Sequence, residues 1–516
     1  MTRQWTNLGD LIDRSLDLTS AAIVDLRDAA HPRSYSHEEV DRLANGVAAA
    51  LRARGFPPGA HVAIASLNRA EYLIAYFGIM RAGLVAVPVN IKQSAEVLDF
   101  VLDDADVVLA FVDRQRHDSL AARVPVIDFD DGGPSGFAAV VRPADLAAVV
   151  PDAGAVAQML YTSGSTGRPK GVPLTHAGQL WALGATYAKP AGPEAERYLL
   201  AQPLFHMNGL FMAKRAFSTN SLLVILPSFD VETYIDALER HRISVLTAVP
   251  TMFARLIKDP GRLAGRDFSA LKRVMLGSAP MSAGLLARIE AAFPQARITH
   301  GYGTTEAGPS IFGPHPDGLP TPPLALGYPL SLDAVRLVDG PDDDHGVLVM
   351  RNPAVMHGYH RLPEKSASVL ADGWYYSGDV MRRDENGFFH FVGRADDMFV
   401  CAGENIYPVE VEKLLESHPA VRQASVVPLP DEERAAVPVA FVVLQPGSDL
   451  TVAALKQHAL RHGPAYQHPR RIEFLAELPW AGTNKVDRHA LLARAGALEA
   501  TQGWSADAAI AGGVAR

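Results

Sequence analysis

The chain has 516 residues, a length that allows about three domains at about 100–200 residues per domain. Apolar residue types make up 48% of it and charged types 20%, so a chain of this length can bury a large core without needing a disulfide or a metal for stability. The net charge of −9, from 48 basic and 57 acidic residues, argues against a protein that coats nucleic acid or an anionic membrane.

Redox and targeting features indicate a cytoplasmic enzyme. Cys401 is the single cysteine, which excludes an internal disulfide framework and a multi-cysteine metal site and is typical of a reducing compartment. The first residues lack the apolar core of a signal peptide, and nowhere do about 18 apolar residues run without interruption. We therefore expect a cytoplasmic location, no transmembrane segment and no nucleic-acid partner.

Short apolar runs alternate with helical patterns through the first three-quarters of the chain. The strands predicted from these runs are 61–65, 84–87, 107–112, 156–161, 222–226, 244–249, 273–276 and 297–300. The helices predicted between them include 70–81, 95–103, 231–242 and 283–293. Continuously apolar strands separated by helices of about 10–15 residues indicate parallel sheets with helices on both faces.

The pattern changes after Pro309. From there to Tyr359, turns rich in Pro and Gly separate short segments such as 335–338 and 347–350, which favours an antiparallel module. The last part of the chain begins a new pattern, with an acidic helix predicted at 409–417 and a strand at 423–427. Residues 499–516 are rich in Ala and Gly without a strong apolar stripe, so we expect a mobile tail.

The most informative segment is 161–171, with the sequence YTSGSTGRPKG, directly after a predicted strand. Its glycines let the backbone curl tightly, so that four hydroxyls and the backbone N–H groups can surround phosphate oxygens beside the positive charge of Lys170. Pro169 stands where a Walker A loop needs glycine, so the segment is a different phosphate loop. A Gly/Ser surface loop is the alternative, and the hydroxyls together with the lysine favour phosphate binding.

Further segments carry polar residues of interest. Residues 301–308, GYGTTEAG, contain Glu306, which could hold a magnesium ion that bridges phosphates, although the segment alone reads equally well as a turn. Residues 374–379, WYYSGD, end in Asp379, and a carboxylate can accept both hydroxyls of a ribose. The remaining segments are 393–398 (GRADDM), 403–408 (GENIYP) and 482–488 (GTNKVDR).

In order and spacing, these segments resemble the core motifs of the adenylate-forming superfamily, which contains acyl-CoA synthetases, firefly luciferase and the adenylation domains of peptide synthetases. The resemblance covers about residues 8–494. It implies an α/β fold with a large N-terminal domain of two helix-flanked sheets plus a small β-barrel-like module, followed by a small, mobile α+β C-terminal domain. The implied boundaries are 1–394 for the N-terminal adenylation domain, 395–500 for the C-terminal domain and 501–516 for a flexible tail.

The resemblance also implies a two-step reaction that uses ATP, Mg²⁺ and coenzyme A. A carboxylate attacks the α-phosphate of ATP to give an acyl-adenylate and pyrophosphate, and a thiol then displaces AMP to give a thioester. A carboxylate is a poor electrophile, and AMP is a far better leaving group than oxide. Because like charges must meet in the first step, cations and preorganised donors should dominate catalysis.

Each implied site residue stands where this sequence matches a family motif. The phosphate loop, expected to hold pyrophosphate, is matched by Thr162, Ser163, Gly164, Ser165, Thr166 and Lys170. Glu306 matches the magnesium ligand, and Thr305 matches the α-phosphate contact. Positions on the nucleotide are matched by Ser278, His300, Gly301 and Tyr302 near adenine and by Asp379 and Arg394 near ribose.

The implied catalytic lysine is Lys485, which bridges the acyl carboxylate and the α-phosphate. An ammonium is a compact point charge that can meet two oxygens in changing geometry. Asn484 stands where the family usually has Gly, and Asn tolerates left-handed backbone angles, so the lysine can still be presented. His300 stands where the family often has Gln, which implies adenine binding with altered hydrogen bonding.

The family uses one site for both steps by rotating its C-terminal domain. Asp396 falls at the hinge position, where a few residues would absorb a large backbone change. After rotation, the segment that begins at Gly403 would line the pantetheine channel. Cys401 lies beside it and is expected to be a small buried residue rather than a nucleophile.

His206 bears on the identity of the acid. It stands in the region where members that activate amino acids place an Asp for the α-ammonium, and an imidazole cannot replace that charge. The resemblance implies that His206 borders the acyl pocket and gates it, while a hydrogen-bonded histidine under a loop is the plainer interpretation. The segments 302–307 and 393–406 are similar to those of bacterial aryl-CoA ligases and of medium-chain fatty acyl-CoA synthetases, so we expect an apolar acid, either aromatic, such as a hydroxycinnamate or benzoate, or medium-chain fatty.

Three alternatives are kept. A malonyl-CoA-type synthetase is favoured by Arg255 alone, because the second arginine of those enzymes is replaced by Ala287, and Arg255 is expected to be a solvated helix residue. An acyl ligase that loads a separate carrier protein remains open, although the chain ends too soon for a fused carrier domain of about 80 residues. A regulatory adenylate-binding protein is disfavoured because Lys485 and Glu306 are retained. A homodimer is a possible assembly.

Overall fold

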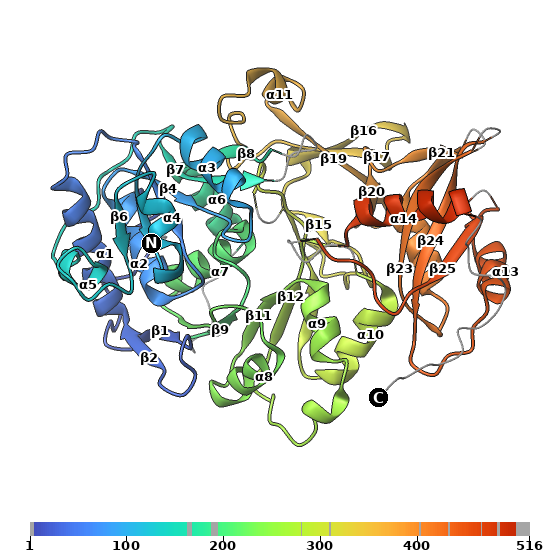
Figure 1. The fold of residues 1–516 in the computed structure, drawn as a ribbon, viewed down its shortest axis with the longest axis horizontal. Coiled ribbons are helices and arrows are strands. Elements are labelled where there is room, and N and C mark those ends of the chain that lie inside the picture. Colours follow the sequence, from blue (N-terminus) through green and yellow to red (C-terminus); the bar gives the residue numbers. More distant parts are fainter. Residues whose placement is uncertain are drawn as a thin grey trace.

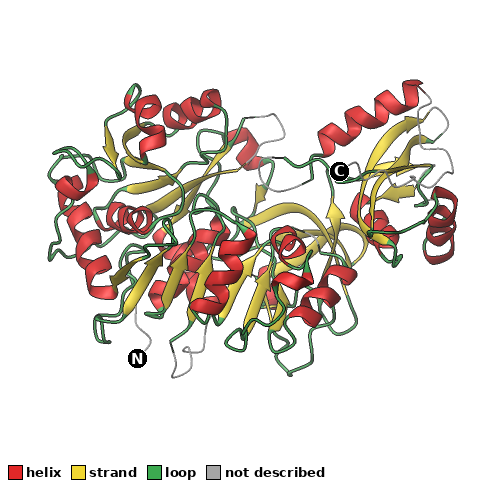
Figure 2. Ribbon diagram, turned by 60° about the horizontal axis from the view of Figure 1, so that its bottom comes forward, coloured by secondary structure: helices red, strands yellow, loops and turns green. Residues whose placement is uncertain are grey.

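The computed structural model describes residues 5–162, 168–186, 195–279, 281–308, 311–401, 404–431, 434–465, 467–481 and 486–501. These residues form two large sheets flanked by helices, an antiparallel module and a C-terminal lobe (Figures 1 and 2). The C-terminal lobe, orange to red in Figure 1, stands apart from the two large sheets, and the antiparallel module lies between them.

The first sheet is mainly parallel. Among the described residues it has six strands in the order β6-β5-β3-β4-β7-β8. Their bounds are Val126–Asp128 (β6), Val107–Val112 (β5), His61–Ala65 (β3), Val85–Pro88 (β4), Val156–Thr162 (β7) and Lys170–Thr175 (β8). Neighbours pair in parallel except β7 and β8, which form an antiparallel hairpin. The central strands are apolar throughout because helices cover both faces.

The second sheet repeats this arrangement. Within the described ranges its seven strands have the order β13-β12-β11-β9-β10-β1-β2. Their bounds are Arg297–His300 (β13), Arg273–Leu276 (β12), Val245–Ala248 (β11), Arg197–Leu200 (β9), Leu222–Ile225 (β10), Ala21–Asp25 (β1) and Arg33–Ser36 (β2). The sheet is parallel apart from the edge strand β2, which is antiparallel to β1.

A layer of helices packs between the two sheets. Every residue of α2 (Ala70–Arg81) is buried, which explains why apolar residues predominate around the helix, with Glu71 and Arg81 near its ends. The same core contains residues of both sheets, such as Ile64 and Ile225, together with residues of the other helices in this layer. Those helices are α1 (His37–Arg52), α6 (His176–Thr186) and α7 (Met207–Ser218).

Other helices cover the outer faces of the sheets. On the first sheet these are α3 (Ala95–Asp104) and α4 (His117–Ala121), and on the second they are α8 (Val231–Arg240), α9 (Pro250–Leu256) and α10 (Ala283–Ala292). Ser94, Asp230 and Ser282 cap α3, α8 and α10, each accepting a hydrogen bond from a backbone N–H of the first turn. A short α5 (Phe137–Val140) follows β6.

The antiparallel module follows the second sheet in sequence. Among the described residues it contains a five-stranded sheet and a two-stranded ribbon, connected by a bridge between Gly327 and Phe389. The strands are β14 (Phe312–Gly313), β15 (Tyr328–Pro329), β16 (Val335–Asp342), β17 (His345–Met350), β18 (Leu370–Ala371), β19 (Trp374–Arg383) and β20 (Phe389–Arg394), with α11 (Pro363–Ala367) between β17 and β18.

The C-terminal lobe has a hydrophobic core of its own, built from residues such as Val439, Phe441 and Leu455. Its elements are β21 (Phe399–Cys401), β22 (Glu404–Ile406), α12 (Pro408–Glu416), β23 (Val421–Asp431), β24 (Ala435–Leu444), α13 (Val452–His462), β25 (Arg471–Phe474) and α14 (Arg488–Thr501). The lobe contacts the module through α12, because Lys413 Nζ donates a hydrogen bond to Phe391 O of β20 at 2.8 Å.

The predicted α/β architecture is confirmed: a large N-terminal domain of sheets and helices precedes a small C-terminal domain. The strands predicted at 61–65, 107–112, 273–276 and 297–300 have the observed bounds. Residues 499–501 of the predicted tail belong to α14, which continues to Thr501 through an Ala-rich stretch that favours helix, and the rest of the tail lies outside the described residues. Cys401 is buried, as expected. No helix of the described residues is long and apolar enough to cross a membrane.

Candidate active site

Several predicted site residues follow the carboxyl ends of parallel strands. Thr162 ends β7, Ser278 follows β12, and His300 ends β13. In open α/β sheets, ligands bind in the crevice outside these ends. Thr162, Ser278 and His300 therefore lie where such a fold places a ligand.

The predicted phosphate loop connects β7 to β8. Thr162 and Lys170 are opposite each other in the hairpin, so the loop begins and ends at the same point of the sheet. The Thr162 hydroxyl is buried and has no hydrogen-bond partner among the described residues. An unsatisfied hydroxyl at this point is suited to a phosphate oxygen. Ser163, Gly164, Ser165 and Thr166 lie outside the described residues.

Tyr359 joins the predicted phosphate lysine to the predicted magnesium ligand. Its hydroxyl donates to Glu306 Oε1 at 3.0 Å, and Lys170 Nζ donates to that hydroxyl at 3.4 Å. Lys170 Nζ also lies 4.4 Å from the centre of the Tyr359 ring. Burial lowers the pKa of Lys170, and the neighbouring Glu306 carboxylate opposes this effect.

Glu306 is suited to a magnesium ion that also binds phosphates. Its loop is closed by reciprocal hydrogen bonds of 3.0 Å between the backbones of Thr304 and Gly308, and Thr305 lies in this turn. Among the described residues, no group of three or more His, Cys, Asp or Glu side chains could hold a metal ion. A single carboxylate is enough when substrate phosphates supply further oxygens, as is usual for Mg²⁺.

The predicted ribose carboxylate is buried and held by two partners. Arg394 Nη1 donates to Asp379 Oδ1 at 2.9 Å, and the Tyr302 hydroxyl donates to Asp379 Oδ2. Burial raises the pKa of Asp379 more than Arg394 lowers it. Ser377 supports this arrangement, because its hydroxyl accepts from Asp379 N at 3.0 Å and its carbonyl accepts from Arg394 Nη1 at 3.0 Å.

The predicted adenine side forms a separate set of contacts. His300 Nε2 is 3.3 Å from Ala279 O, and its Nδ1 is buried with no partner among the described residues. Burial lowers the pKa of His300, which favours the neutral imidazole. Gly301 N donates to Leu276 O at 2.7 Å. Ser278 has a φ of +65°, a backbone angle uncommon for a residue with a side chain and found often at functional sites.

His206 occupies the N-cap of α7, with its ring centre 4.7 Å from that of Phe205. Met207, Leu210 and Phe211, in the first two turns of α7, are buried. The histidine therefore lies at the N-terminal end of a helix whose first two turns carry buried apolar side chains. The resemblance places the acid at this end of the helix.

Two predicted residues of the C-terminal lobe fall outside the described residues. These are Gly403, between β21 and β22, and Lys485, between Trp480 and Val486. Trp480 and Val486, which lie on either side of this part of the chain, form a backbone bridge.

Sequence reasoning missed Tyr359 and Tyr375. Tyr359 lies between Lys170 and Glu306, and the pKa of buried Tyr375 is raised by burial and by the nearby Glu306. Tyr375 belongs to the segment 374–379, which the sequence analysis selected because of Asp379. Its place in that segment could therefore have suggested that it lies near the site. Tyr359 lies in no such segment, and only the structure shows that it contacts both charged groups.

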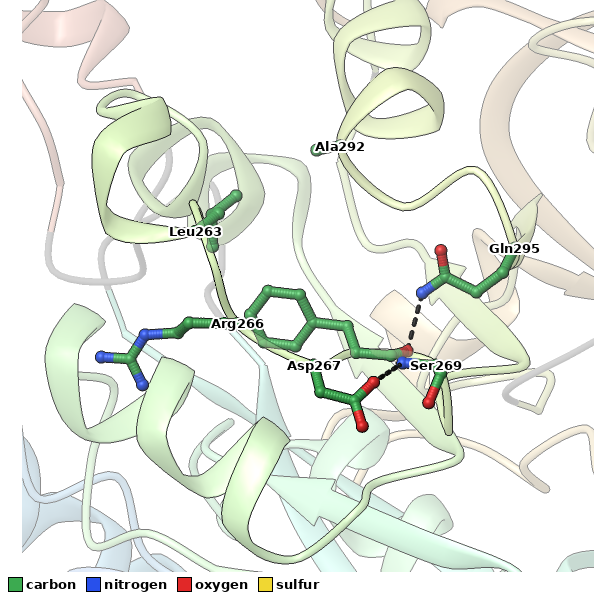
Figure 3. A pocket seen from close by; sticks show the side chains of 7 residues that line it. Leu263, Arg266, Asp267, Ser269, Ala292 and Gln295 are labelled. Carbon is green, nitrogen blue, oxygen red and sulfur yellow. Dashed lines mark hydrogen bonds between the residues drawn. The ribbon is translucent and has the colours of Figure 1, made fainter.

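A hollow on the outer side of the second sheet lies apart from these residues (Figure 3). It is lined by Leu263, Arg266, Asp267, Phe268, Ser269, Ala292 and Gln295. Its polar groups bond one another: Gln295 Nε2 donates to Phe268 O at 2.7 Å, and Ser269 N donates to Asp267 Oδ1 at 2.9 Å. None of its residues was predicted for the site, so we assign it no catalytic role.

Comparison with known families agrees with this geometry. Residues 19–360 match the family model described as AMP-binding enzyme, and residues 410–485 match that of the AMP-binding enzyme C-terminal domain. The chain therefore belongs to the AMP-binding, or adenylate-forming, enzyme family. It is an ATP-dependent, AMP-forming acid–CoA ligase, and it uses ATP, Mg²⁺ and coenzyme A.

Curated relatives and solved structures resemble the chain over nearly its whole length. A feruloyl-CoA synthase of Amycolatopsis is 35% identical over 463 residues, covering 87% of this chain and 90% of the relative. MatB from Rhodopseudomonas palustris, solved with bound ATP, has a TM-score of 0.85 at 28% identity and covers 95% of this chain and 98% of its own. The anthranilate CoA ligase AuaEII, solved with anthranoyl-AMP, has a TM-score of 0.85 at 25% identity and covers 96% and 98%.

Proposed function

We propose that the enzyme activates an apolar carboxylic acid, aromatic or medium-chain fatty, and transfers the acyl group to coenzyme A. The observation that carries this proposal is the start of α7, where His206 occupies the N-cap position and the apolar side chains of Met207, Leu210 and Phe211 follow, all of them buried. Segment 203–211 contains no carboxylate that could bind the ammonium of an amino acid. An apolar acid can bury its chain or ring against such a face.

In the proposed first step, the acid carboxylate attacks the α-phosphate, and the bond from that phosphorus to pyrophosphate breaks. Thr162 and Lys170 bind pyrophosphate oxygens, and Asp379 accepts hydrogen bonds from the ribose hydroxyls. Lys485 neutralises the negative charges of the acid carboxylate and the α-phosphate as they approach each other. Glu306 would hold a magnesium ion, which when bound would supply positive charge to the phosphates.

Malonate is a weaker candidate than an apolar acid. The Arg255 guanidinium is exposed on α9 and lies over the Phe229 ring at 5.3 Å, as expected for a solvated helix residue. Ala287 supplies no second cation on α10. The chain is similar in fold to MatB, but these two positions do not provide a pair of guanidinium groups for a second carboxylate.

A carrier protein is the alternative acyl acceptor. A relative from Streptomyces coeruleorubidus, 31% identical, is a fatty acid–[acyl-carrier-protein] ligase. Thioester formation from ATP, Mg²⁺ and a panel of cinnamates, benzoates, fatty acids and malonate, with either coenzyme A or a carrier protein, separates these functions. The proposal expects turnover of an aromatic or medium-chain acid with coenzyme A. Turnover of malonate alone, or with a carrier protein alone, would contradict it.

We also propose a cytoplasmic location and a homodimeric assembly. The location is supported by the presence of a single cysteine, Cys401, which suits a reducing compartment in which ATP and coenzyme A are available. Sedimentation of the purified chain measures the assembly directly, and a monomer at all concentrations would contradict a homodimer.

A further inference from the structure

Five polar side chains form a connected group deep in the layer between the two large sheets. We call the group the buried polar cluster, and it consists of Tyr72 and Tyr76 of α2, Gln158 of β7, Gln179 of α6 and Lys214 of α7. Each is at most 1% exposed. None of them belongs to the phosphate, ribose or adenine contacts described above.

Hydrogen bonds connect four members of the cluster in a row. Lys214 Nζ donates to Gln179 Oε1 at 2.8 Å, and Gln158 Nε2 donates to the same oxygen at 3.4 Å. The Tyr76 hydroxyl donates to Gln158 Oε1. Tyr72 is close enough to Tyr76 to raise its own pKa further, beyond the larger effect of burial.

The cluster holds more donors than acceptors. Gln179 Nε2 and the Tyr72 hydroxyl have no partner among the described residues. The Lys214 ammonium has three N–H donors, and Gln179 Oε1 is its acceptor in the described part of the chain. Lys214 forms no ion pair there, and burial alone lowers its pKa, to about 7. Leaving such donors unpaired in an apolar layer is costly, so an acceptor from outside the chain would stabilise them.

Lys214 lies on α7, the helix whose N-cap residue is His206. Met207 and Lys214 are seven residues apart, which places them on the same side of α7 after two turns. Side chains on a helix lean towards its N-terminus, so the ammonium reaches back towards the turn of Phe211. Gln179 lies on α6, which packs against α7. The proposed acid pocket begins at His206, so an acid inserted along this face would point its far end at the cluster.

We propose that the buried polar cluster is the far end of the acid pocket and selects acids that carry a hydrogen-bond-accepting oxygen remote from the reacting carboxylate. This inference rests on the proposed function and narrows its substrate class. Lys214 and Gln179 supply the donors, and the rest of the pocket remains apolar. The oxygen belongs either to a ring hydroxyl or to a second carboxylate, and the two sources are compared separately below.

The test compares matched acid pairs in the wild type and in Lys214→Met, which keeps the length of the side chain but removes its donors. The pairs are cinnamate with 4-hydroxycinnamate and octanoate with octanedioate, and kcat/KM is measured by pyrophosphate release. We expect the wild type to prefer the oxygen-bearing member of at least one pair, and this preference to fall about 10- to 100-fold in Lys214→Met, the range for a lost hydrogen bond to a charged group. The pair that responds identifies the source of the oxygen.

A second variant of the cluster and a control variant at the surface complete the test. Gln179→Glu gives the ammonium an internal counter-charge that competes with the acid, so the preference should fall there too, even if Lys214→Met folds poorly. The exposed Lys258→Met is the matched control and should leave the preference as in the wild type. A preference that stays the same in both cluster variants, whether or not overall rates fall, would overturn the inference and leave the cluster as a structural feature.

A binding readout separates this inference from the proposed function. Shifts in Tm caused by the same acids, without ATP, measure binding when there is no turnover. An enzyme that releases no pyrophosphate with any acid contradicts the proposed function. The ratio of the Tm shifts in wild type and Lys214→Met still decides whether the cluster binds the remote oxygen.

Discussion

Asp379 is subject to two opposing effects at the proposed ribose site. Burial favours its protonated form, while Arg394 and the Tyr302 hydroxyl favour the carboxylate that a ribose requires. Arg394 in turn bonds Asp396, with Nε donating to Oδ1 at 2.9 Å. The position of one guanidinium therefore connects the ribose carboxylate to the proposed hinge.

A substitution at Gly378 tests whether the position of the Arg394 guanidinium matters for ATP binding. Its φ is +72°, and a Cβ there would lie 3.1 Å from Arg394 Nη2. We expect Gly378→Ala to add about 1–2 kcal/mol of backbone strain and to displace Arg394, so that the KM for ATP rises several-fold. Steady-state kinetics with varied ATP measures this. Gly154→Ala, where a Cβ would meet nothing within 4 Å, is the control. Equal KM values in the two variants would contradict the proposed contact.

At the residue scale, the sequence predicted the charged groups but not the side chains that hold them. Lys170, Glu306 and Asp379 stand in segments whose residue types suggest a chemistry, and the order of the motifs and their resemblance to a family added Arg394. Tyr359 became visible only after folding brought residues 170, 306 and 359 together. Contacts between distant segments depend on packing, which no local pattern encodes.

At the scale of elements, a buried glutamate at the end of α12 contributes to the stability of the C-terminal lobe. Glu416 lies at its last turn, and its Oε1 accepts from Ala424 N of β23 at 3.0 Å. Burial raises the pKa of Glu416 to about 8, against an ordinary value of 4.5. Because the folded state then binds more protons than the unfolded state, this group stabilises the fold at low pH, and its contribution is lost as the pH rises through about 8.

Glu416→Gln should therefore change how stability depends on pH. Gln keeps an acceptor for Ala424 N–H but carries no charge, so the variant should gain stability relative to the wild type as the pH rises from about 5 to 9, by more than about 1 kcal/mol. Tm measured at several pH values gives this difference. The exposed Glu477→Gln serves as the control. Parallel Tm curves for wild type and Glu416→Gln would show that burial does not perturb this carboxyl.

Predicted elements agree with the structure where both faces of a strand are buried. The apolar run at 107–112 was recognised because the parallel sheet buries five of its six residues. The strand at 273–276 starts with a half-buried Arg273 and was recognised from the apolar residues that follow it. The edge strand β2, with the sequence RSYS, was missed because half of it is exposed and polar. The strand β19 was missed because its ten residues include Gly378 and polar site residues, which obscure a strand pattern.

At the scale of the whole molecule, we propose that the C-terminal lobe rotates about Asp396 between the two half-reactions. In the structure the lobe meets the module closely, since a Cβ at Gly393 would lie 3.2 Å from Tyr407 Cβ. The polar contacts of α12 with the large domain include the hydrogen bond from Lys413 to β20 and one between Glu416 and Ser282 at the N-cap of α10, and a rotation can break both. Rotation of a small domain about a few residues is a common way to assemble two sites from one.

Asp396→Pro tests the hinge because proline fixes φ. We expect thioester formation to slow about tenfold or more while adenylation is affected far less, because only the second step needs the rotated lobe. Asp396→Ala is the matched variant, as it removes the carboxylate but leaves φ free. Single-turnover assays of the two half-reactions measure the effects. Equal slowing of both steps in Asp396→Pro would place the hinge elsewhere.

The central claim is that Lys485 on the C-terminal lobe completes the adenylation site of the large domain. The most direct measurement compares Lys485→Ala with the wild type in two assays: pyrophosphate release from ATP and the acid, and thioester formation from a preformed acyl-adenylate and coenzyme A. We predict a loss of about 100-fold or more in the first assay and a far smaller change in the second. Pyrophosphate release at the wild-type rate, or an equal loss in both assays, would contradict the account.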